Sequence, residues 1–159
     1  MEKSNVVADR AYENIKIRQE SGGVYGIPSG ISRLDGMTCG WQPGDVTLIA
    51  ARTSVGKTAL GSQLAIGALK ANKRVLLFSL EMTNDQVMER MLSNVSRVPI
   101  RIVVDNTCNE TQKNEFITAK NWLHSSPLMM DDDGSITVGG IRAKARKLAR
   151  RGLDMIVID

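Results

Sequence analysis

The sequence predicts an α/β domain in which helices cover both faces of a parallel sheet. Three observations lead to this class. Four short apolar runs have the length and composition of strands that are buried on both faces. Segments with helical periodicity separate these runs, and parallel strands need such long crossover connections. The composition, with 42% hydrophobic and 24% charged residues over 159 positions, is that of one globular domain.

The first 23 residues are expected to form a separate unit, followed by the main domain over residues 24–159. Residues 5–20 are predicted to be helical, because Val7, Ala11 and Ile15 repeat every four positions. The helix should end at the break Ser21-Gly22-Gly23. Its apolar stripe must be buried either on its own domain or on a neighbouring subunit, and composition does not choose between them.

The first half of the main domain begins with turns. Residues 24–45 are rich in Gly and Pro. The run Val46-Thr-Leu-Ile-Ala-Ala51 is then predicted to be a strand buried on both faces. A helix over 57–71 and a second buried strand over 75–80 follow.

The second half continues the alternation. A helix over 83–96 is predicted from the spacing of its apolar residues, with Thr83 or Asn84 as its cap. Residues 97–114 are polar and mixed, so we expect a loop and then a short helix to about Leu123. The remaining predicted elements are a strand over 127–131, a helix over 137–151 and a strand over 155–159. Because Asp159 closes a strand directly, the sequence suggests a domain that is incomplete at its C-terminal end.

The formal charge of +4 is concentrated in one segment. Residues 137–151 carry six basic residues and no acidic one, which fits a solvated helix face or a DNA contact. Cys39 and Cys108 have no metal-ligand spacing and are interpreted as reduced thiols, with a disulfide as the alternative. No signal peptide or membrane span is predicted, so a cytoplasmic protein is expected.

Residues 51–58 form the phosphate-binding pattern G-x-x-x-x-G-K-[ST], with Ala51 in place of the first glycine. Gly56 permits the tight turn that aims backbone N–H groups at phosphate oxygens. Lys57 supplies a positive charge, and the hydroxyl of Thr58 is a candidate ligand for Mg²⁺. The predicted nucleotide-binding residues are Arg52, Thr53, Ser54, Val55, Gly56, Lys57, Thr58 and Ala59.

Two acids are expected beside this loop. Met155-Ile-Val-Ile-Asp159 has the Walker B form, in which an acid at a strand end helps to hold the metal ion. Glu81 follows the strand 75–80 directly and is the candidate catalytic base, with helix capping as its structural alternative. The run Asp131-Asp-Asp133 is interpreted as turn chemistry, because Gly134 follows it, and His124 as a structural residue.

Several motifs together resemble one family. They are Gly26-Ile-Pro-Ser-Gly-Ile-Ser-Arg-Leu-Asp35, Gly40-Trp-Gln-Pro-Gly-Asp45, Ile49-Ala-Ala-Arg-Thr-Ser-Val-Gly-Lys-Thr58, Phe78-Ser-Leu-Glu-Met82, Ile141-Arg-Ala-Lys-Ala-Arg146 and Ile156-Val-Ile-Asp159. This set resembles the motor domain of the DnaB-type replicative DNA helicases over nearly the whole chain. Cys39 departs from the family pattern, which usually has Gly there.

The resemblance implies a RecA-like core that binds ATP and Mg²⁺ and drives translocation on single-stranded DNA. It assigns Glu81 and Lys57 to catalysis and Thr58 and Asp159 to the metal ion. It also makes residues 5–20 the linker helix that docks on the next subunit of a hexamer, with primase and a helicase loader as possible partners, in a bacterial or phage protein. The family's arginine finger and DNA-binding loops are not found in these residues. We therefore expect the 159 residues alone to unwind no DNA and to hydrolyse ATP poorly, because a missing finger costs about 10³–10⁵ in rate.

Two other functions remain open at this point. A recombinase or clock-type ATPase would share the RecA core, although Phe78-Ser-Leu-Glu-Met82 argues against it. A nucleotide-binding assembly module without turnover would also use the phosphate loop, and the helix at 5–20 is consistent with a role in assembly.

Overall fold

The computed structural model describes residues 2–20, 24–52 and 54–159, without the side chain of Arg18. The helices are Ser4–Glu20 (α1), Ser32–Thr38 (α2), Lys57–Lys70 (α3), Asn84–Ser96 (α4), Ile100–Val104 (α5), Glu110–Ser125 (α6) and Val138–Ala149 (α7). The strands are Val75–Phe78 (β1), Leu128–Asp131 (β2) and Met155–Ile158 (β3). The predicted break at 21–23 lies outside the described residues.

The three strands form a parallel sheet in the order β2-β1-β3. Val75 of β1 lies opposite Leu128 on one side and Met155 on the other. All four residues of β1 are buried, as expected for a central strand that has helices on both faces. The predicted parallel α/β class and three of its four strands are therefore confirmed.

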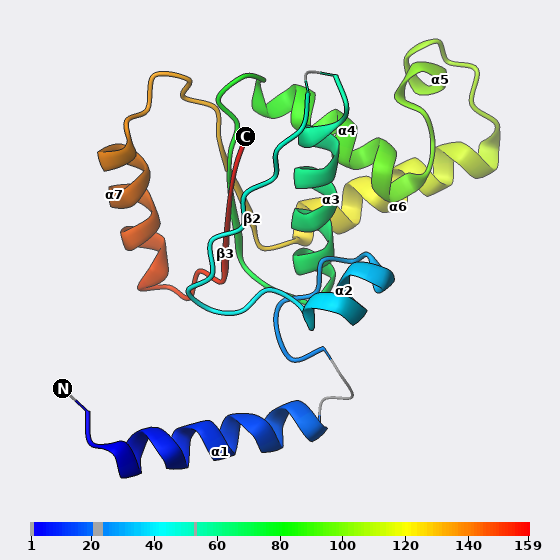
Figure 1. The fold of residues 1–159 in the computed structure, drawn as a ribbon. Coiled ribbons are helices and arrows are strands. Elements are labelled where there is room, and N and C mark those ends of the chain that lie inside the picture. Colours follow the sequence, from blue (N-terminus) through cyan, green and yellow to red (C-terminus); the bar gives the residue numbers. More distant parts are fainter. Residues whose placement is uncertain (1, 21–23, 53) are drawn as a thin grey trace.

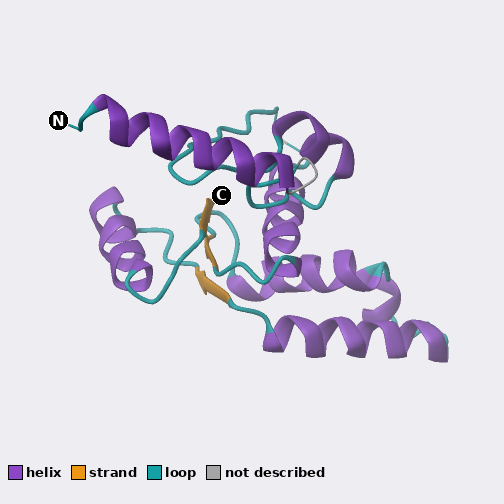
Figure 2. Ribbon diagram, turned by 90° about the horizontal axis from the view of Figure 1, so that it is seen from below, coloured by secondary structure: helices purple, strands orange, loops and turns teal. Residues whose placement is uncertain are grey.

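Helices cover the two faces of the sheet unequally (Figure 1). On one face α3 packs against the sheet, and α4 and α6 lie outside it, so the core contains Ile66, Leu77 and Met91. On the other face, α7 is the one helix among the described residues. Successive side chains of β3 point to opposite faces of the sheet, so Val157 belongs to the core on the α3 side while Ile156 borders α7. Figure 2 shows the same layers from below.

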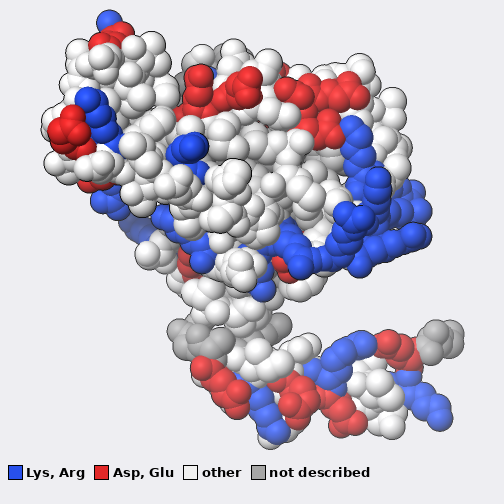
Figure 3. All heavy atoms as spheres, turned by 180° about the vertical axis from the view of Figure 1, so that it is seen from behind, with Lys and Arg blue, Asp and Glu red and all other residues white. Residues whose placement is uncertain are grey.

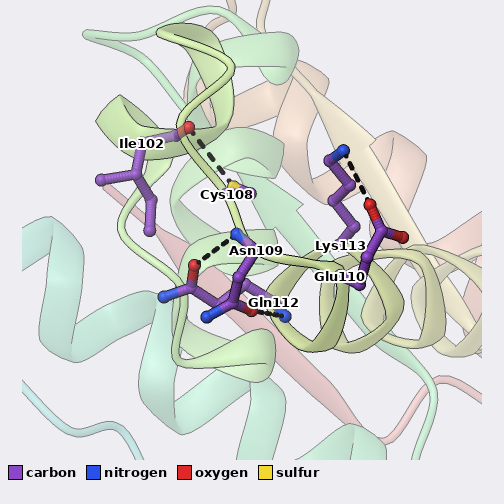
Figure 4. Close-up of polar contacts among 6 residues, drawn as sticks. All are labelled: Ile102, Cys108, Asn109, Glu110, Gln112 and Lys113. Atoms are coloured by element: carbon purple, nitrogen blue, oxygen red, sulfur yellow. Dashed lines mark hydrogen bonds and ion pairs between the residues drawn. The ribbon is translucent and has the colours of Figure 1, made fainter.

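The helices of the middle region begin at capping boxes. Thr83 is the N-cap of α4, and its hydroxyl accepts from the backbone N–H of Gln86, whose side chain bonds back to Thr83. Asn109 and Gln112 form the same reciprocal pair at the start of α6 (Figure 4). The loop predicted over 97–114 is thus wrong in part: α5 lies inside it and α6 begins at Glu110. A box built on Asn and Gln explains the early start.

The predicted strand over 46–51 is not formed. Residues 46–51 have no regular secondary structure and take part in no strand pairing with the described residues. Val46 is 97% and Leu48 90% exposed. The local sequence has strand propensity, but an apolar run becomes a strand only when a neighbouring strand accepts its backbone hydrogen bonds, and among the described residues none does.

A segment before this run is attached closely to α3. Gly67 faces Ser29 so closely that a Cβ there would lie 2.3 Å from the Ser29 carbonyl carbon and oxygen. The buried carboxylate of Asp35 accepts a hydrogen bond of 2.7 Å from the N–H of Ser29. Asp35 belongs to α2, a short helix that the abundance of turn residues concealed.

Helix α1 confirms the prediction for residues 5–20, with one extra residue at its start. Its large apolar side chains are exposed, and Tyr12 is 60% accessible. Figure 1 shows α1 standing apart from the sheet and its helices. In the part of the chain that is described, no helix is long and apolar enough to cross a membrane.

Candidate nucleotide site

The carboxyl ends of β1 and β3 lie side by side at one edge of the sheet. The N–H of Leu80 donates to the carbonyl of Asp159 at 2.7 Å, and the N–H of Asp159 donates to the carbonyl of Phe78 at 3.0 Å. Glu81 comes directly after this bonded pair, and its side chain is exposed. The structure therefore places the backbones of the two predicted acids, Glu81 and Asp159, next to each other.

Helix α3 points its first turn toward the same edge. Gly61 lies against the sheet, and a Cβ there would meet the Val157 side chain at 3.6 Å. From Gly61 back to Thr58 the helix rises about 4.5 Å, while β3 advances roughly 6.6 Å from Val157 to Asp159. Because α3 and β3 run in opposite directions, as Figure 1 shows, the start of the helix and the end of the strand lie at the same edge of the sheet.

The loop before α3 has the backbone of an anion-binding turn. Ser54 has a φ of 65° and Gly56 a φ of 106°, and both are left-handed conformations. Successive turns of this kind aim N–H groups into one concavity. The N–H of Val55 donates to the carbonyl of Arg52 at 3.4 Å, but no side chain caps the start of α3 and its first turn has no acid, so the N–H groups of that first turn are available to an anion. Thr53 of this loop lies outside the described residues.

Lys57 and Thr58 occupy the first positions of α3, where both are half-buried. Within residues 2–20, 24–52 and 54–159, neither side chain takes part in a hydrogen bond or ion pair. Arg52, Ser54, Val55 and Ala59 are exposed around them. A half-buried cation beside an open helix N-terminus fits a phosphate group.

Asp159 has an unsatisfied oxygen. Its Oδ2 atom is buried and, among the described residues, accepts no hydrogen bond. Such a carboxylate oxygen is costly to leave unpaired, and a divalent cation is a suitable partner for it. In the described part of the chain, no group of three or more His, Cys, Asp and Glu side chains is arranged so that it could hold a metal ion. A metal ion bound at Asp159 would therefore need further ligands, and phosphate oxygens and the hydroxyl of Thr58 are the candidates.

Sequence reasoning missed the residue that shapes the turn carrying Glu81. Ser79 is buried at the end of β1, and its hydroxyl donates to the carbonyl of Met82 at 2.7 Å. On the other side of this turn, a Cβ at Gly134 would lie 3.2 Å from the carbonyl oxygen of Leu80. A polar residue at the first position after a buried strand was the available signal for Ser79.

The three acids at the end of β2, Asp131, Asp132 and Asp133, have structural partners. Asp131 forms an ion pair with Lys144, and Asp132 accepts from the N–H of Asn84 at 2.9 Å. The Ser135 hydroxyl and N–H donate to Asp133, and these bonds hold the pKa of Asp133 below its ordinary value. The bonds of Asp133 fit the interpretation as turn chemistry, whereas Asp131 and Asp132 contact α7 and the start of α4.

The charged side chains are sorted by position. Seen from behind, acidic side chains gather along the upper edge, and basic side chains gather on the side that carries α7 (Figure 3). The upper edge is where the strands end, so an anionic nucleotide bound there would need a cation, and Lys57 is the candidate side chain at the start of α3.

Comparison with known proteins gives one consistent answer. The model of the DnaB-like helicase C-terminal domain matches residues 26–159. The replicative DNA helicase DnaB of Geobacillus stearothermophilus is 38% identical over 153 residues, which cover 94% of this chain and 34% of that protein. The replicative DNA helicase DnaC of Bacillus subtilis is 37% identical over 153 residues, with the same shares. The chain thus spans about a third of the length of these relatives.

Solved structures show the same likeness in three dimensions. The ATPase domain of G40P superposes with a TM-score of 0.86 at 25% identity, over 99% of this chain and 57% of that one. A DnaB-like replicative helicase, solved in a study of its interactions with primase, gives a TM-score of 0.84 at 26% identity, over 100% of this chain and 39% of that one. The expected RecA-like fold is confirmed, and the chain belongs to the DnaB-like helicase C-terminal domain family.

Proposed function

We propose that this chain supplies the nucleotide-binding part of an ATP-driven replicative DNA helicase. Membership of the family supports this proposal, and so does the edge of the sheet at which Lys57, Glu81 and Asp159 are carried. Because the chain spans about a third of its curated relatives, unwinding, translocation on single-stranded DNA and contacts with primase or a loader are proposed for the whole protein. A bacterial or phage cytoplasm is the compartment proposed for it.

The proposed roles follow from the chemistry of each group. The N–H groups around Gly56 and the charge of Lys57 hold the triphosphate, together with the other residues from Arg52 to Ala59. Thr58 and Asp159 hold Mg²⁺, which supplies charge neutralisation on the phosphates when bound. Glu81 orients the attacking water and takes its proton. Its exposed carboxylate, three residues after the end of the buried strand β1, has access to solvent.

One observation carries the proposal. A buried Asp159 oxygen, which has no hydrogen-bond partner among the described residues, lies at the sheet edge toward which the first turn of α3 points, and no side chain caps that turn. An orphaned acceptor and a set of orphaned donors at the same edge are complementary to a metal–phosphate pair. A structural role alone would leave both sets of groups without partners.

Nucleotide binding by the 159-residue chain tests the proposal. Fluorescent ATP should bind in the presence of Mg²⁺, and Lys57→Ala should weaken binding by roughly 10- to 100-fold, the value of one charge-assisted contact of 1.5–3 kcal/mol. Lys70→Ala is the matched control, because Lys70 is the last residue of the same helix and is exposed. Equal affinities of the two variants would refute the phosphate cradle.

The metal role is tested by Asp159→Asn. The change keeps the shape of the side chain and removes its charge, so the gain in affinity that Mg²⁺ gives should fall by about tenfold, the equivalent of 1.4 kcal/mol. Binding without Mg²⁺ should stay the same. An unchanged Mg²⁺ dependence would remove Asp159 from the metal site.

Glu81 is tested in the whole protein that carries this chain. Glu81→Gln should leave nucleotide affinity within about twofold and lower the rate of hydrolysis by about 10²–10⁴, the usual contribution of a general base. Asp85→Asn, in the first turn of α4, is the control for charge near the edge. Hydrolysis at the normal rate in Glu81→Gln would assign the base elsewhere.

Assembly through α1 is part of the same proposal. The helix exposes Val6, Tyr12, Ile15 and Ile17, which favours burial against another subunit of a homo-hexamer. Ile15→Glu should lower the oligomeric mass measured by light scattering, whereas Lys16→Glu on the same helix should not. If both variants assemble normally, α1 is not the docking element. An assembly module without turnover would keep this behaviour and nucleotide binding while Glu81→Gln changed nothing.

A further inference from the structure

The turn that carries the candidate base is flanked by the ends of both neighbouring strands. The N–H of Leu80 is bonded to the end of β3, and the N–H of Ser79 donates to the carbonyl of Asp131 in β2 at 2.9 Å. We define the β2 loop as residues 132–137, which connect β2 to α7. The sheet order β2-β1-β3 therefore places Glu81 beside the β2 loop, at the edge where the strands end (Figure 1).

The β2 loop contacts this turn at two points. Oδ2 of Asp132 accepts a hydrogen bond of 2.9 Å from the backbone N–H of Asn84, the first residue of α4. Gly134 lies so close to Leu80 that a Cβ there would be 3.2 Å from the Leu80 carbonyl oxygen. One contact comes directly before Glu81 and the other three residues after it. The loop therefore restrains the backbone on both sides of the candidate base.

The β2 loop is itself held in place. Asp131 forms an ion pair with Lys144 of α7, and its Oδ1 atom accepts from the N–H of Asp133 at 3.2 Å. Oδ1 of Asp133 accepts in turn from the N–H and the hydroxyl of Ser135, at 3.0 and 2.7 Å. Asp132 thus lies between two residues with bonded carboxylates, while its own carboxylate reaches the turn. A side chain that is supported in this way can fix the position of another segment.

The stability of α4 does not account for the contact. Thr83 and Gln86 form a capping box at the start of α4, and Asp85 supplies an acid in its first turn. The helix therefore has a local cap and a favourable charge of its own. The bond from Asp132 comes instead from a segment 48 residues away, and it fixes the point at which the turn of Glu81 joins the helix.

We propose that Asp132 is a positioning residue for ATP hydrolysis, because it holds the backbone from which Glu81 meets the attacking water. This inference rests on the proposed function, in which Glu81 is the base. The Glu81 side chain is exposed and, among the described residues, forms no hydrogen bond or ion pair, so its backbone is what directs it. A general base must lie within hydrogen-bond reach of its proton, and a displacement of about 1 Å can cost roughly 10² in rate.

Steady-state hydrolysis of ATP by the whole protein that carries this chain tests the inference. Asp132→Ala removes the acceptor and should lower kcat by roughly 10- to 100-fold, while KM for ATP stays within about twofold. Asp132→Asn keeps an oxygen that can accept from the N–H of Asn84, so its kcat should stay within about threefold of wild type. The control is Asp85→Ala, which removes an exposed acid from the start of α4 and should change kcat by less than about twofold.

A double variant separates positioning from an independent role. If Asp132 acts through Glu81, adding Asp132→Ala to Glu81→Gln should lower kcat by less than about twofold further. Effects that multiply would show that Asp132 acts on its own, and would overturn the proposal. Ser79→Ala loosens the same turn from within and should lower kcat by roughly three- to tenfold with KM unchanged, so the test remains valid if Asp132→Ala does not fold.

The other outcomes are equally decisive. A normal kcat in folded Asp132→Ala, beside slow hydrolysis in Glu81→Gln, would overturn the positioning role and leave the base in place. Normal hydrolysis in Glu81→Gln would remove the base itself, which is a failure of the proposed function. If Asp132→Asn were as slow as Asp132→Ala, the charge and not the hydrogen bond would matter, and positioning would be wrong. A raised KM in both would assign Asp132 to nucleotide binding and also overturn it.

Discussion

Residues 46–51 and strand β1 are both short apolar runs, but only β1 forms a paired and buried strand. In β1, Val75 is paired on each side, to Leu128 and to Met155, and the whole strand is buried. In the other run, Val46 and Leu48 are almost fully exposed. Both runs have the β-branched and apolar residues that favour strands, so intrinsic propensity does not separate them.

The difference between the two runs comes from their neighbours. β1 has a strand on each side, so its backbone N–H and C=O groups find hydrogen-bond partners in the sheet. Helices cover both faces, so its side chains are buried. The run 46–51 leads into the phosphate loop at 51–58, so the loop is attached through an unpaired segment on one side and through α3 on the other. The acids of the site therefore follow two paired strands, whereas the candidate phosphate-binding residues lie between a segment without strand pairing and α3.

The largest expected effect sharpens this comparison directly. Leu77→Ala in β1 should lower the free energy of unfolding by ~2–5 kcal/mol, because the 3% exposed side chain leaves a cavity in the core. Leu48→Ala is the matched substitution in the other run, and it should change stability by less than about 0.5 kcal/mol. Urea unfolding followed by circular dichroism measures both. A large loss for Leu48→Ala would show that this run is docked in solution.

The attachment of the preceding segment is tested at Gly67. Gly67→Ala should cost roughly 1–3 kcal/mol, because its Cβ would overlap the backbone of Ser29, which cannot move without displacing the buried Asp35. Gly36→Ala is the control, since no atom lies within 4 Å of its Cβ and the position is helical, so stability should rise by up to about 1 kcal/mol. Equal stability of the two variants would mean that residues 24–45 are not fixed on α3.

A smaller effect is expected at the turn that carries Glu81. Ser79→Ala removes the hydrogen bond to the carbonyl of Met82 and should cost about 1 kcal/mol. Amide exchange should become faster at residues 79–82. Thr118→Ala, whose hydroxyl bonds the carbonyl of Asn114 on the exposed side of α6, should be neutral within about 0.5 kcal/mol. Unchanged exchange in Ser79→Ala would show that the rest of β1 suffices to hold the turn.

The smallest effect depends on pH. The folded-state pKa of Asp133 lies below its unfolded value of 3.8, so the contribution of this carboxylate is present above pH 3.8 and is lost as the pH falls through the lower folded value. Ser135→Ala removes the first cause of the shift. The difference in melting temperature between wild type and Ser135→Ala should therefore shrink as the pH falls through this range. A constant difference would contradict the role of the Asp133 charge.

Periodicity and motif spacing were sufficient for most of the fold. The helix at 57–71 is predicted because its apolar residues repeat, and residue type limits the cap of the next helix to Thr83 or Asn84, of which Thr83 is the cap in the structure. The start of α6 at Glu110 was missed, because Asn109 and Gln112 form a capping box outside the usual Ser/Thr–Glu form. The prediction of a strand at 46–51 is wrong, because a strand needs a neighbouring strand to pair with, and the sequence of these six residues does not show whether one is present.

The candidate site was predicted unevenly for similar reasons. Strand order places Asp159 beside Leu80, and the rule that parallel strands share a carboxyl edge was enough to expect it. Ser79 and Gly134 act through contacts between segments far apart in the sequence, and local spacing does not contain such contacts. The assignment of each residue to phosphate, metal or water remains a prediction that the binding experiments test.

The sheet order has a consequence during synthesis of the protein. The central strand β1 is synthesised before both of its partners. Val75 pairs with Leu128 and with Met155, and Met155 is added to the chain 155 − 75 = 80 residues after Val75. At about 5–20 residues per second, a ribosome needs roughly 4–16 s to make that stretch. During this time the sequence Val-Leu-Leu-Phe has an open edge, which is an aggregation hazard and a target for chaperones. Translation speed between residues 79 and 155 should therefore influence the yield of folded protein.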